Sequence, residues 1–214
     1  MRAPEFWQRD GGFPGGFLAP LGWCYGLAGR IRFALARPVK SPVPVICVGN
    51  LVTGGAGKTP VAINLARRLI AEGRNVRFLT RGYGGRLAGP IRVDPKTHTP
   101  VDVGDEALLL ARVASAWVAR DRAHGVAAAA DDAEDGSPDV IIMDDGFQNP
   151  SVEKDLSLLV VDGEFGFGNG HVFPAGPLRE SVGSALGRAD AVILIGGDDA
   201  GIKNNLAARK NTPP

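Results

Sequence analysis

The sequence contains few of the residues that define metal-binding or disulfide-bonded proteins. Its 214 residues include two cysteines, Cys24 and Cys47, and three histidines. The cysteines form no CxxC pair, and no histidine lies at a metal-ligand spacing from them, which argues against a zinc site or a disulfide framework. Two unpaired thiols in a chain of this size are typical of a protein from a reducing compartment.

A charge excess of either sign is also lacking. The chain has 24 Lys and Arg against 23 Asp and Glu, for a formal net charge of +1. Nucleic-acid binders usually carry a strong basic excess, so we expect no nucleic-acid partner. Hydrophobic residues make up 44% and charged residues 22% of the chain, which is ordinary for a globular fold that buries most of its apolar surface.

The N-terminal region has an uncharged stretch that is too short to span a bilayer, because a spanning helix needs about 20 apolar residues. This stretch, residues 17–29, includes Trp23 and Tyr25 and is followed by three arginines, of which Arg30 is the first. Aromatic residues next to arginines favour an anionic membrane surface. We therefore predict that residues 1–40 form a membrane-associated segment with a helix, and that residues 1–16 of this segment are irregular. The alternative is a helix packed on the protein's own core.

The best-defined chemical motif runs through Val52, Thr53, Gly54, Gly55, Ala56, Gly57, Lys58 and Thr59. It lies between a short apolar run and an amphipathic stretch, which is the context of a phosphate-binding loop. Glycines let backbone N–H groups face phosphate oxygens, and the helix start adds positive potential. Lys58 can reach the β- and γ-phosphates of ATP, and Thr59 can place its hydroxyl on Mg²⁺.

One position departs from the usual pattern of such a loop, because Val52 replaces a glycine. Gly54 and Gly55 can supply the turn instead. The alternative is a glycine turn that happens to precede a Lys-Thr pair.

Two aspartates, Asp144 and Asp145, follow the apolar run 140–143. Open α/β sheets place their ligands at the carboxyl ends of strands. In P-loop enzymes an acid at this position holds Mg²⁺, directly or through water. We therefore predict that Thr59, Asp144 and Asp145 bind the metal of Mg-ATP.

Short apolar runs alternate with helical patterns along most of the chain. The patterns predict strands at 43–48, 76–80, 117–119, 140–143, 156–161 and 191–195, and helices at 58–72, at 104–116 and from 123. This alternation predicts an α/β fold of the P-loop NTPase type, a parallel sheet with helices on both faces. We assign residues 41–197 to this kinase domain and 198–214 to a polar tail or the start of a truncated second domain.

Three further features are weaker when taken singly. Arg81 follows a predicted strand and can pair with a phosphate, or it can belong to a flexible turn. Asp105 and Glu106 stand at a helix start, where one explanation is capping and another is a catalytic base. Arg122 can steer a phosphate or simply be solvated.

Together these motifs resemble one family, the tetraacyldisaccharide 4′-kinases, which are the lipid A 4′-kinases of Gram-negative bacteria. The resemblance covers roughly residues 17–197. The matching stretches, in the family's order, are VPVICVGNLVTGGAGKTPVAINLARRL, LTRGYGG, VGDEALLLAR, DDGFQ, VVDGEFGFGNG and PAGPLRE.

The resemblance implies a lipid kinase that moves the γ-phosphate of ATP to the 4′-hydroxyl of tetraacyldisaccharide 1-phosphate, giving lipid IVA. It implies an enzyme at the cytoplasmic face of the bacterial inner membrane. We predict no obligate protein partner. It implies a catalytic base at Asp105, acting with Lys58 and Asp145. It also implies nucleotide or lipid-sugar binding by Arg81, Tyr83, Glu106, Arg122, Gln148, Asn169, Arg179 and Glu180.

Two departures from the family accompany the resemblance. Asn149 stands where the family usually has histidine, and we expect a modest effect. Family members also continue into a second α/β domain, which brings a histidine thought to work with the base and which this chain largely lacks. Two other functions stay open. A membrane-linked ATPase switch of the partitioning type would carry lysine at Thr53, and an inactive nucleotide-binding fragment would transfer nothing.

Overall fold

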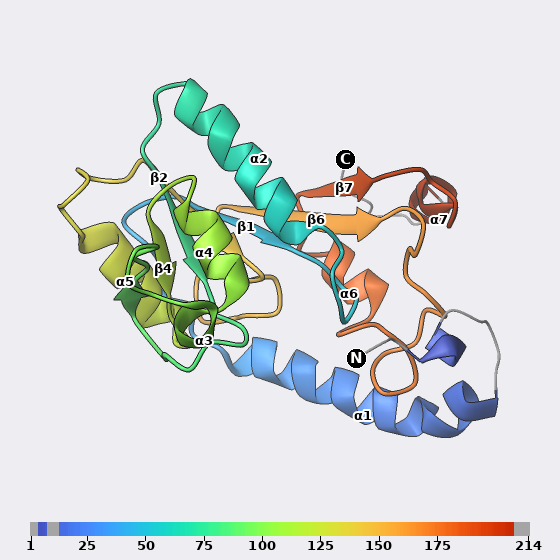
Figure 1. The fold of residues 1–214 in the computed structure, drawn as a ribbon. Coiled ribbons are helices and arrows are strands. Elements are labelled where there is room, and N and C mark those ends of the chain that lie inside the picture. Colours follow the sequence, from blue (N-terminus) through green and yellow to red (C-terminus); the bar gives the residue numbers. More distant parts are fainter. Residues whose placement is uncertain (1–3, 8–12, 208–214) are drawn as a thin grey trace. The chain divides into compact units, whose positions relative to one another are not determined.

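The computed structural model describes residues 4–7 and 13–207, and it has a mixed α/β architecture (Figure 1). The chain forms two compact units that interleave along the sequence. The sheet unit comprises Arg37–Gly49 and Lys58–Ser157. The α1 unit comprises Met1–Ala36, Asn50–Gly57 and Leu158–Pro214. The predicted domain boundaries at residues 40 and 197 stay a prediction.

Five strands build the core of the sheet unit in the order β3-β4-β2-β5-β1. Neighbours are parallel except for β3, which is antiparallel to β4. Every residue of β2 and β5 is buried, and strands that are covered on both faces read as continuous apolar runs. The strands are β1 (Val45–Gly49), β2 (Val76–Thr80), β3 (Ile91–Arg92), β4 (Ala116–Val118) and β5 (Val140–Asp144).

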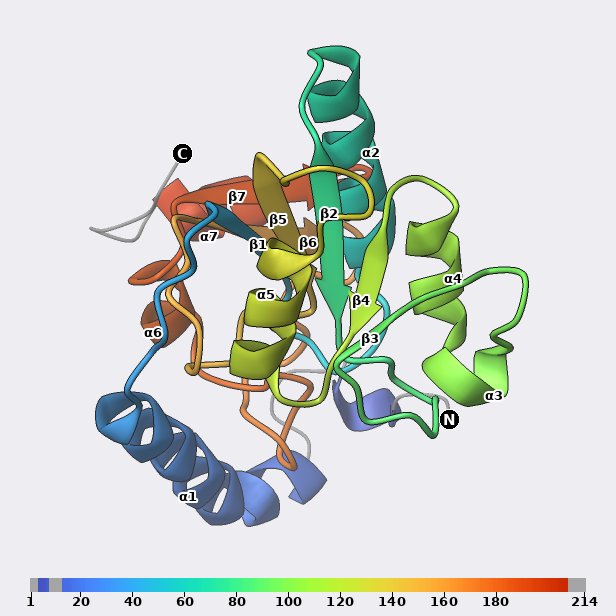
Figure 2. The same ribbon diagram turned by 90° about the vertical axis from the view of Figure 1, so that its left-hand side faces the viewer.

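Helices cover both faces of this sheet (Figure 2). α2 (Lys58–Ala71) and α4 (Asp105–Ala111) lie on one side, and α5 (Arg122–Asp131) lies on the other. Val126 and Ala129 of α5 belong to a fully buried apolar cluster with residues of β1, β2 and β5. The short helix α3 (Pro100–Val103) precedes α4, and Gly104 turns the chain between them at a φ of 86°.

The α1 unit contains a parallel strand pair, β6 (Leu156–Asp162) and β7 (Ala191–Ile195). Its helices are the 3-10 turn η1 (Glu5–Trp7), α1 (Phe13–Leu35), α6 (Val182–Leu186) and α7 (Ile202–Ala207). One face of α1 packs on the loop that contains Val172. A Cβ at Gly22 would lie 2.7 Å from the Val172 carbonyl oxygen, so this approach requires glycine.

The other face of α1 carries exposed apolar side chains. Phe17 is 78% exposed, Trp23 is 69% exposed and Leu35 is 77% exposed. Leu21, Leu27 and Ile31 on the same helix are exposed as well. No helix in the described ranges, 4–7 and 13–207, is long and apolar enough to cross a bilayer.

The predicted elements match the structure except at several ends. The strands predicted at 76–80 and 191–195 are confirmed to the residue, and those at 140–143 and 156–161 each extend by one aspartate. The helix predicted over 104–116 is wrong at its end, because Ala116 pairs with Phe78 in the sheet. The irregular stretch predicted over 1–16 is wrong at 5–7 and from 13 onward, while 1–3 and 8–12 lie outside the described residues. α7 lies within the predicted polar tail.

Candidate active site

The acid pair at the end of β5 contacts the first residues of α2. The Thr59 hydroxyl donates a hydrogen bond of 2.8 Å to Asp144 Oδ2. Lys58 Nζ lies 3.6 Å from Asp145 Oδ1. Asp145 has a φ of 56°, a left-handed conformation that aspartate tolerates better than most residues. The sheet unit therefore brings together the two aspartates and the Lys-Thr pair, four residues that the sequence assigned to the site.

The charge state of Asp144 is set mainly by its burial. Burial raises the pKa of Asp144 to about 6, and the hydrogen bond from Thr59 opposes that rise. The nearby carboxylates of Glu106 and Asp145 raise this pKa further, whereas Lys58 lowers it. A buried carboxyl surrounded by other acids is typical of a functional site that binds a cation.

The residues around Asp144 fit a magnesium ion. Asp144 Oδ1 is buried and has no hydrogen-bond partner among the described residues, which is costly unless a cation or water satisfies it. Mg²⁺ prefers oxygen ligands and usually takes only one or two carboxylates, with substrate phosphates and waters completing its shell. Across residues 4–7 and 13–207, no three His, Cys, Asp or Glu side chains are grouped to hold a metal by themselves.

Asp144→Asn is expected to stabilise the protein when Mg²⁺ and nucleotide are absent. The pKa of Asp144 rises from 3.8 to about 6 on folding. Ionisation of this carboxyl therefore destabilises the folded state increasingly as the pH rises through that interval. Asparagine keeps an acceptor for Thr59 without the charge. We expect the free energy of unfolding to increase by about 1 to 3 kcal/mol at pH 7.5 and by much less at pH 4. Urea denaturation of both proteins measures this, and an equal gain at both pH values would contradict burial as the cause.

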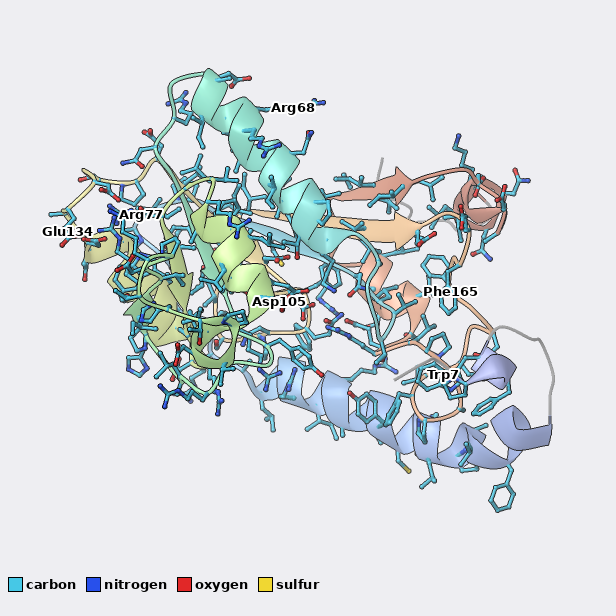
Figure 3. All side chains as sticks on the ribbon, in the orientation of Figure 1. Trp7, Arg68, Arg77, Asp105, Glu134 and Phe165 are labelled. Atoms are coloured by element: carbon cyan, nitrogen blue, oxygen red, sulfur yellow. The ribbon has the colours of Figure 1, made fainter. Side chains whose placement is uncertain are left out.

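The start of α4 is held against the loop that follows β2. A Cβ at Gly104 would lie 2.4 Å from the Tyr83 carbonyl oxygen, so only glycine permits the contact. Asp105 is the first residue of α4 (Figure 3) and is exposed. Glu106 is half-buried, and its charge acts on Asp144. The structure thus groups Glu106 with the acid pair, and it leaves the Asp105 carboxylate accessible to a substrate.

Arg122 is a buried cation of the sheet unit. Its side chain is only 3% exposed, so the alternative of a solvated arginine is wrong. Its Nη1 donates to the Ala119 carbonyl oxygen. Burial lowers the pKa of Arg122 to about 10, Asp145 opposes that shift, and Arg81 adds to it. Arg122 therefore lies within electrostatic reach of both the acid pair and Arg81.

The phosphate loop of the α1 unit is supported by a neighbouring segment. Val52 forms an antiparallel bridge with Leu178. Thr53 N donates to the Pro177 carbonyl oxygen at 2.8 Å, and Arg179 N donates to the Leu51 carbonyl oxygen at 2.7 Å. Val52 is buried, which explains why an apolar residue occupies this position instead of glycine. Gly57 ends the loop with a φ of 73°, and the chain then enters the sheet unit at Lys58.

The remaining sequence-predicted residues are spread over both units. Asn169 donates from Nδ2 to the carbonyl oxygens of Phe6 and Ala175, at 3.2 and 3.0 Å. Its amide therefore braces the α1 unit internally. Arg179 and Glu180 lie in the same unit, next to the bridge with Val52. In the sheet unit Tyr83 is 78% exposed and Gln148 is half-buried.

Sequence reasoning missed the role of the segment Pro177–Arg179, although its motif PAGPLRE was already conspicuous. Its partner in the loop is far away in the sequence, so composition carried no signal for the pairing. It also missed Arg188, whose Nη2 donates to both carboxylate oxygens of Glu180 at 2.8 Å. A lone arginine in a turn after a short helix has no sequence signature of its own.

Comparison with known proteins gives a consistent picture. Residues 15–213 match the family model of LpxK, tetraacyldisaccharide-1-P 4′-kinase. The tetraacyldisaccharide 4′-kinase of Parvibaculum lavamentivorans is 59% identical over 213 residues, covering 98% of this chain and 60% of that protein. The protein of the same name from Rhodospirillum centenum is 55% identical over 205 residues, covering 94% of this chain and 60% of that protein.

A solved structure agrees with these matches. The crystal structure of LpxK from Aquifex aeolicus in complex with ATP has a TM-score of 0.72 and 33% identity, and it covers 84% of this chain and 58% of that one. The chain spans about 60% of the length of the curated relatives it matches. With a family match over nearly its whole length, this chain belongs to the tetraacyldisaccharide-1-phosphate 4′-kinase family.

Proposed function

We propose that this chain binds Mg-ATP and transfers the γ-phosphate to the 4′-hydroxyl of tetraacyldisaccharide 1-phosphate, giving lipid IVA. The observation that carries the proposal is the cluster at the end of β5, in which Asp144 meets Thr59 and Asp145 meets Lys58. Phosphoryl transfer needs positioning and charge neutralisation more than covalent chemistry, and this cluster supplies both. The relatives' names and the ATP complex of the Aquifex aeolicus protein support it.

Residues of the sheet unit supply the positive charges and the general base for the reaction. Lys58 brings a positive charge to the β- and γ-phosphates, where charge develops during transfer. Asp105, exposed at the start of α4, accepts the proton of the attacking sugar hydroxyl. Arg81 and Arg122 add positive potential for phosphate groups. A bound Mg²⁺ supplies further neutralisation of the phosphate oxygens, and Thr59, Asp144 and Asp145 are the side chains that would hold it.

The test is a direct assay of the purified chain with Mg-ATP and tetraacyldisaccharide 1-phosphate in detergent micelles. Mass spectrometry follows the lipid, and calorimetry measures ATP binding. A gain of one phosphate on the lipid supports the proposal. ATP binding without transfer favours the alternative of an inactive nucleotide-binding fragment. A chimera that appends the C-terminal part of the Parvibaculum lavamentivorans relative then shows whether transfer needs the part of the relatives that this chain does not span.

The exposed face of α1 supports membrane association as a second part of the proposal. Phe17, Trp23 and Leu35 are each more than two-thirds exposed, and burying such side chains in an interface is favourable by about 1.5 to 3 kcal/mol each. The arginines that follow suit anionic headgroups. We place the protein at the cytoplasmic face of the bacterial inner membrane, where its lipid acceptor is confined to the same surface.

Replacing two of these apolar residues is expected to release the protein from vesicles. We expect Leu21→Ser with Trp23→Ser to reduce partitioning onto anionic phospholipid vesicles by at least about tenfold, because two buried apolar side chains are lost. Co-sedimentation with vesicles measures the bound fraction. The matched control is Ile70→Ser with Val101→Ser, which alters two exposed apolar residues of the sheet unit. Equal binding by all three proteins would contradict a membrane role for α1.

A further inference from the structure

Arg188 links three parts of the α1 unit through its guanidinium group. Its Nη2 donates to both carboxylate oxygens of Glu180 at 2.8 Å. Its Nη1 donates to the carbonyl oxygen and the hydroxyl of Ser184 at 3.2 and 3.1 Å. The guanidinium carbon stacks on Phe33 of α1, 4.1 Å from the ring centroid. These contacts fix the guanidinium group from several directions.

The ion pair between Arg188 and Glu180 is partly buried. The side chain of Glu180 is 13% exposed and that of Arg188 is 30% exposed. A charge-assisted pair at this depth is stronger than a surface salt bridge, because less water competes for it. Loss of the arginine would remove this ion pair from the Glu180 carboxylate.

Glu180 directly follows the segment that supports the phosphate loop. Arg179 N donates to the Leu51 carbonyl oxygen at 2.7 Å, and Leu178 bridges Val52. Leu178 is fully buried, so this short pairing is anchored in the unit's interior. Glu180 is close in sequence to the segment that pairs with Val52 and Thr53. A shift of Glu180 would therefore move the backbone of that segment as well.

Phe33 comes from the packed face of α1, not from its exposed apolar face. Gly22, Gly26 and Phe33 recur at helical spacing, so they share one side of the helix. Gly22 and Gly26 both approach Val172. The Phe33 ring is thus presented to Arg188 by the same packing that seats α1 on the unit.

From these contacts we propose that Arg188 is a positioning residue of the kinase reaction. It holds Glu180, and through Pro177–Arg179 the phosphate loop, in a geometry that depends on the seating of α1 at Phe33. This rests on the proposed function, together with the substrate-binding role that the family resemblance implies for Glu180 and the phosphate loop.

The test is a double-mutant cycle of Arg188→Met and Glu180→Gln, with Phe33→Leu as a third variant and Arg74→Met as the matched control. Arg74 is an exposed arginine of the sheet unit. We expect Arg188→Met to lower kcat/KM about tenfold or more and to weaken Mg-ATP binding. In the Glu180→Gln background the same change is expected to have little further effect, because contacting residues are not additive. Arg188→Lys is expected to recover part of the loss, and Phe33→Leu to show a smaller loss.

The outcomes separate this inference from the proposed function. Additive effects of Arg188→Met and Glu180→Gln, or wild-type nucleotide affinity and kcat/KM in Arg188→Met, would overturn the positioning role while the kinase reaction stands. Coupled losses in Mg-ATP affinity without any lipid phosphorylation by the wild type would support the positioning role and reject transfer by this chain. Circular dichroism and thermal melting of each variant show whether a loss comes from unfolding instead, and the milder Phe33→Leu and Arg188→Lys variants then decide the question.

Discussion

Lys58→Met is expected to reduce kcat/KM for lipid phosphorylation by about 10³ or more, because a single preorganised charge at the transferring phosphate is worth about that much. Lys58 is only 7% exposed and lies 3.6 Å from Asp145 Oδ1, so it is already placed before nucleotide arrives. Methionine keeps an unbranched apolar stem of similar size and lacks the ammonium group. Initial rates at varied ATP, with the lipid product measured by mass spectrometry, give the change in kcat/KM.

The matched control for this prediction is Lys96→Met, which removes an exposed lysine of the sheet unit. We expect its kcat/KM to equal that of the wild type. Retention of more than about a tenth of wild-type activity by Lys58→Met would mean that the phosphate charge is neutralised elsewhere. In that case Arg81 and Arg122 are the next groups to replace, because their charges lie on the same unit.

Asp105→Asn is expected to lower kcat by about 10² to 10⁴, the usual contribution of a general base, with little change in the affinity for Mg-ATP. Asparagine preserves the shape of the side chain at the start of α4 but cannot accept the proton of the sugar hydroxyl. Single-turnover rates measure the chemical step, and calorimetry measures ATP affinity. The control is Asp131→Asn, an exposed aspartate of α5.

Glu106→Gln distinguishes the two neighbouring acids of α4. Glu106 is close enough to raise the pKa of Asp144, so its replacement is expected to alter the metal dependence of the reaction more than the proton transfer. If Glu106→Gln loses the chemical step and Asp105→Asn keeps it, Glu106 is the base and the assignment from the family resemblance is wrong.

The core of the candidate site was predictable because its parts are local. A few consecutive residues are enough to recognise the glycine loop before Lys58. The same is true of the aspartates at the end of a strand. Parallel strands carry their carboxyl ends to one edge, which brings such motifs together. The contacts of Thr59 with Asp144 and of Lys58 with Asp145 then follow from topology.

The contacts that could not be predicted from the sequence involve residues that are distant along the chain. The bridge between Val52 and Leu178 has no local signal, although it accounts for the missing glycine of the loop. Arg122 follows the helix cap Asp121, and only the tertiary structure buries its side chain. The run of small residues after α4 favours helix by propensity, yet Ala116 pairs with β2, since tertiary context overrides a weak preference.

The interleaving of the two units has a consequence for biosynthesis. α1 is translated before its packing partners, which include Val172 and Arg188. Trp7 and Pro174 of the same unit, which share a hydrogen bond, are 167 residues apart. Contacts of such long sequence separation form late, and N-terminal segments emerge from the ribosome first. Until residues 172–188 are made, the packed face of α1 is without the contacts that seat it. α1 is therefore synthesised well before the segment on which it packs.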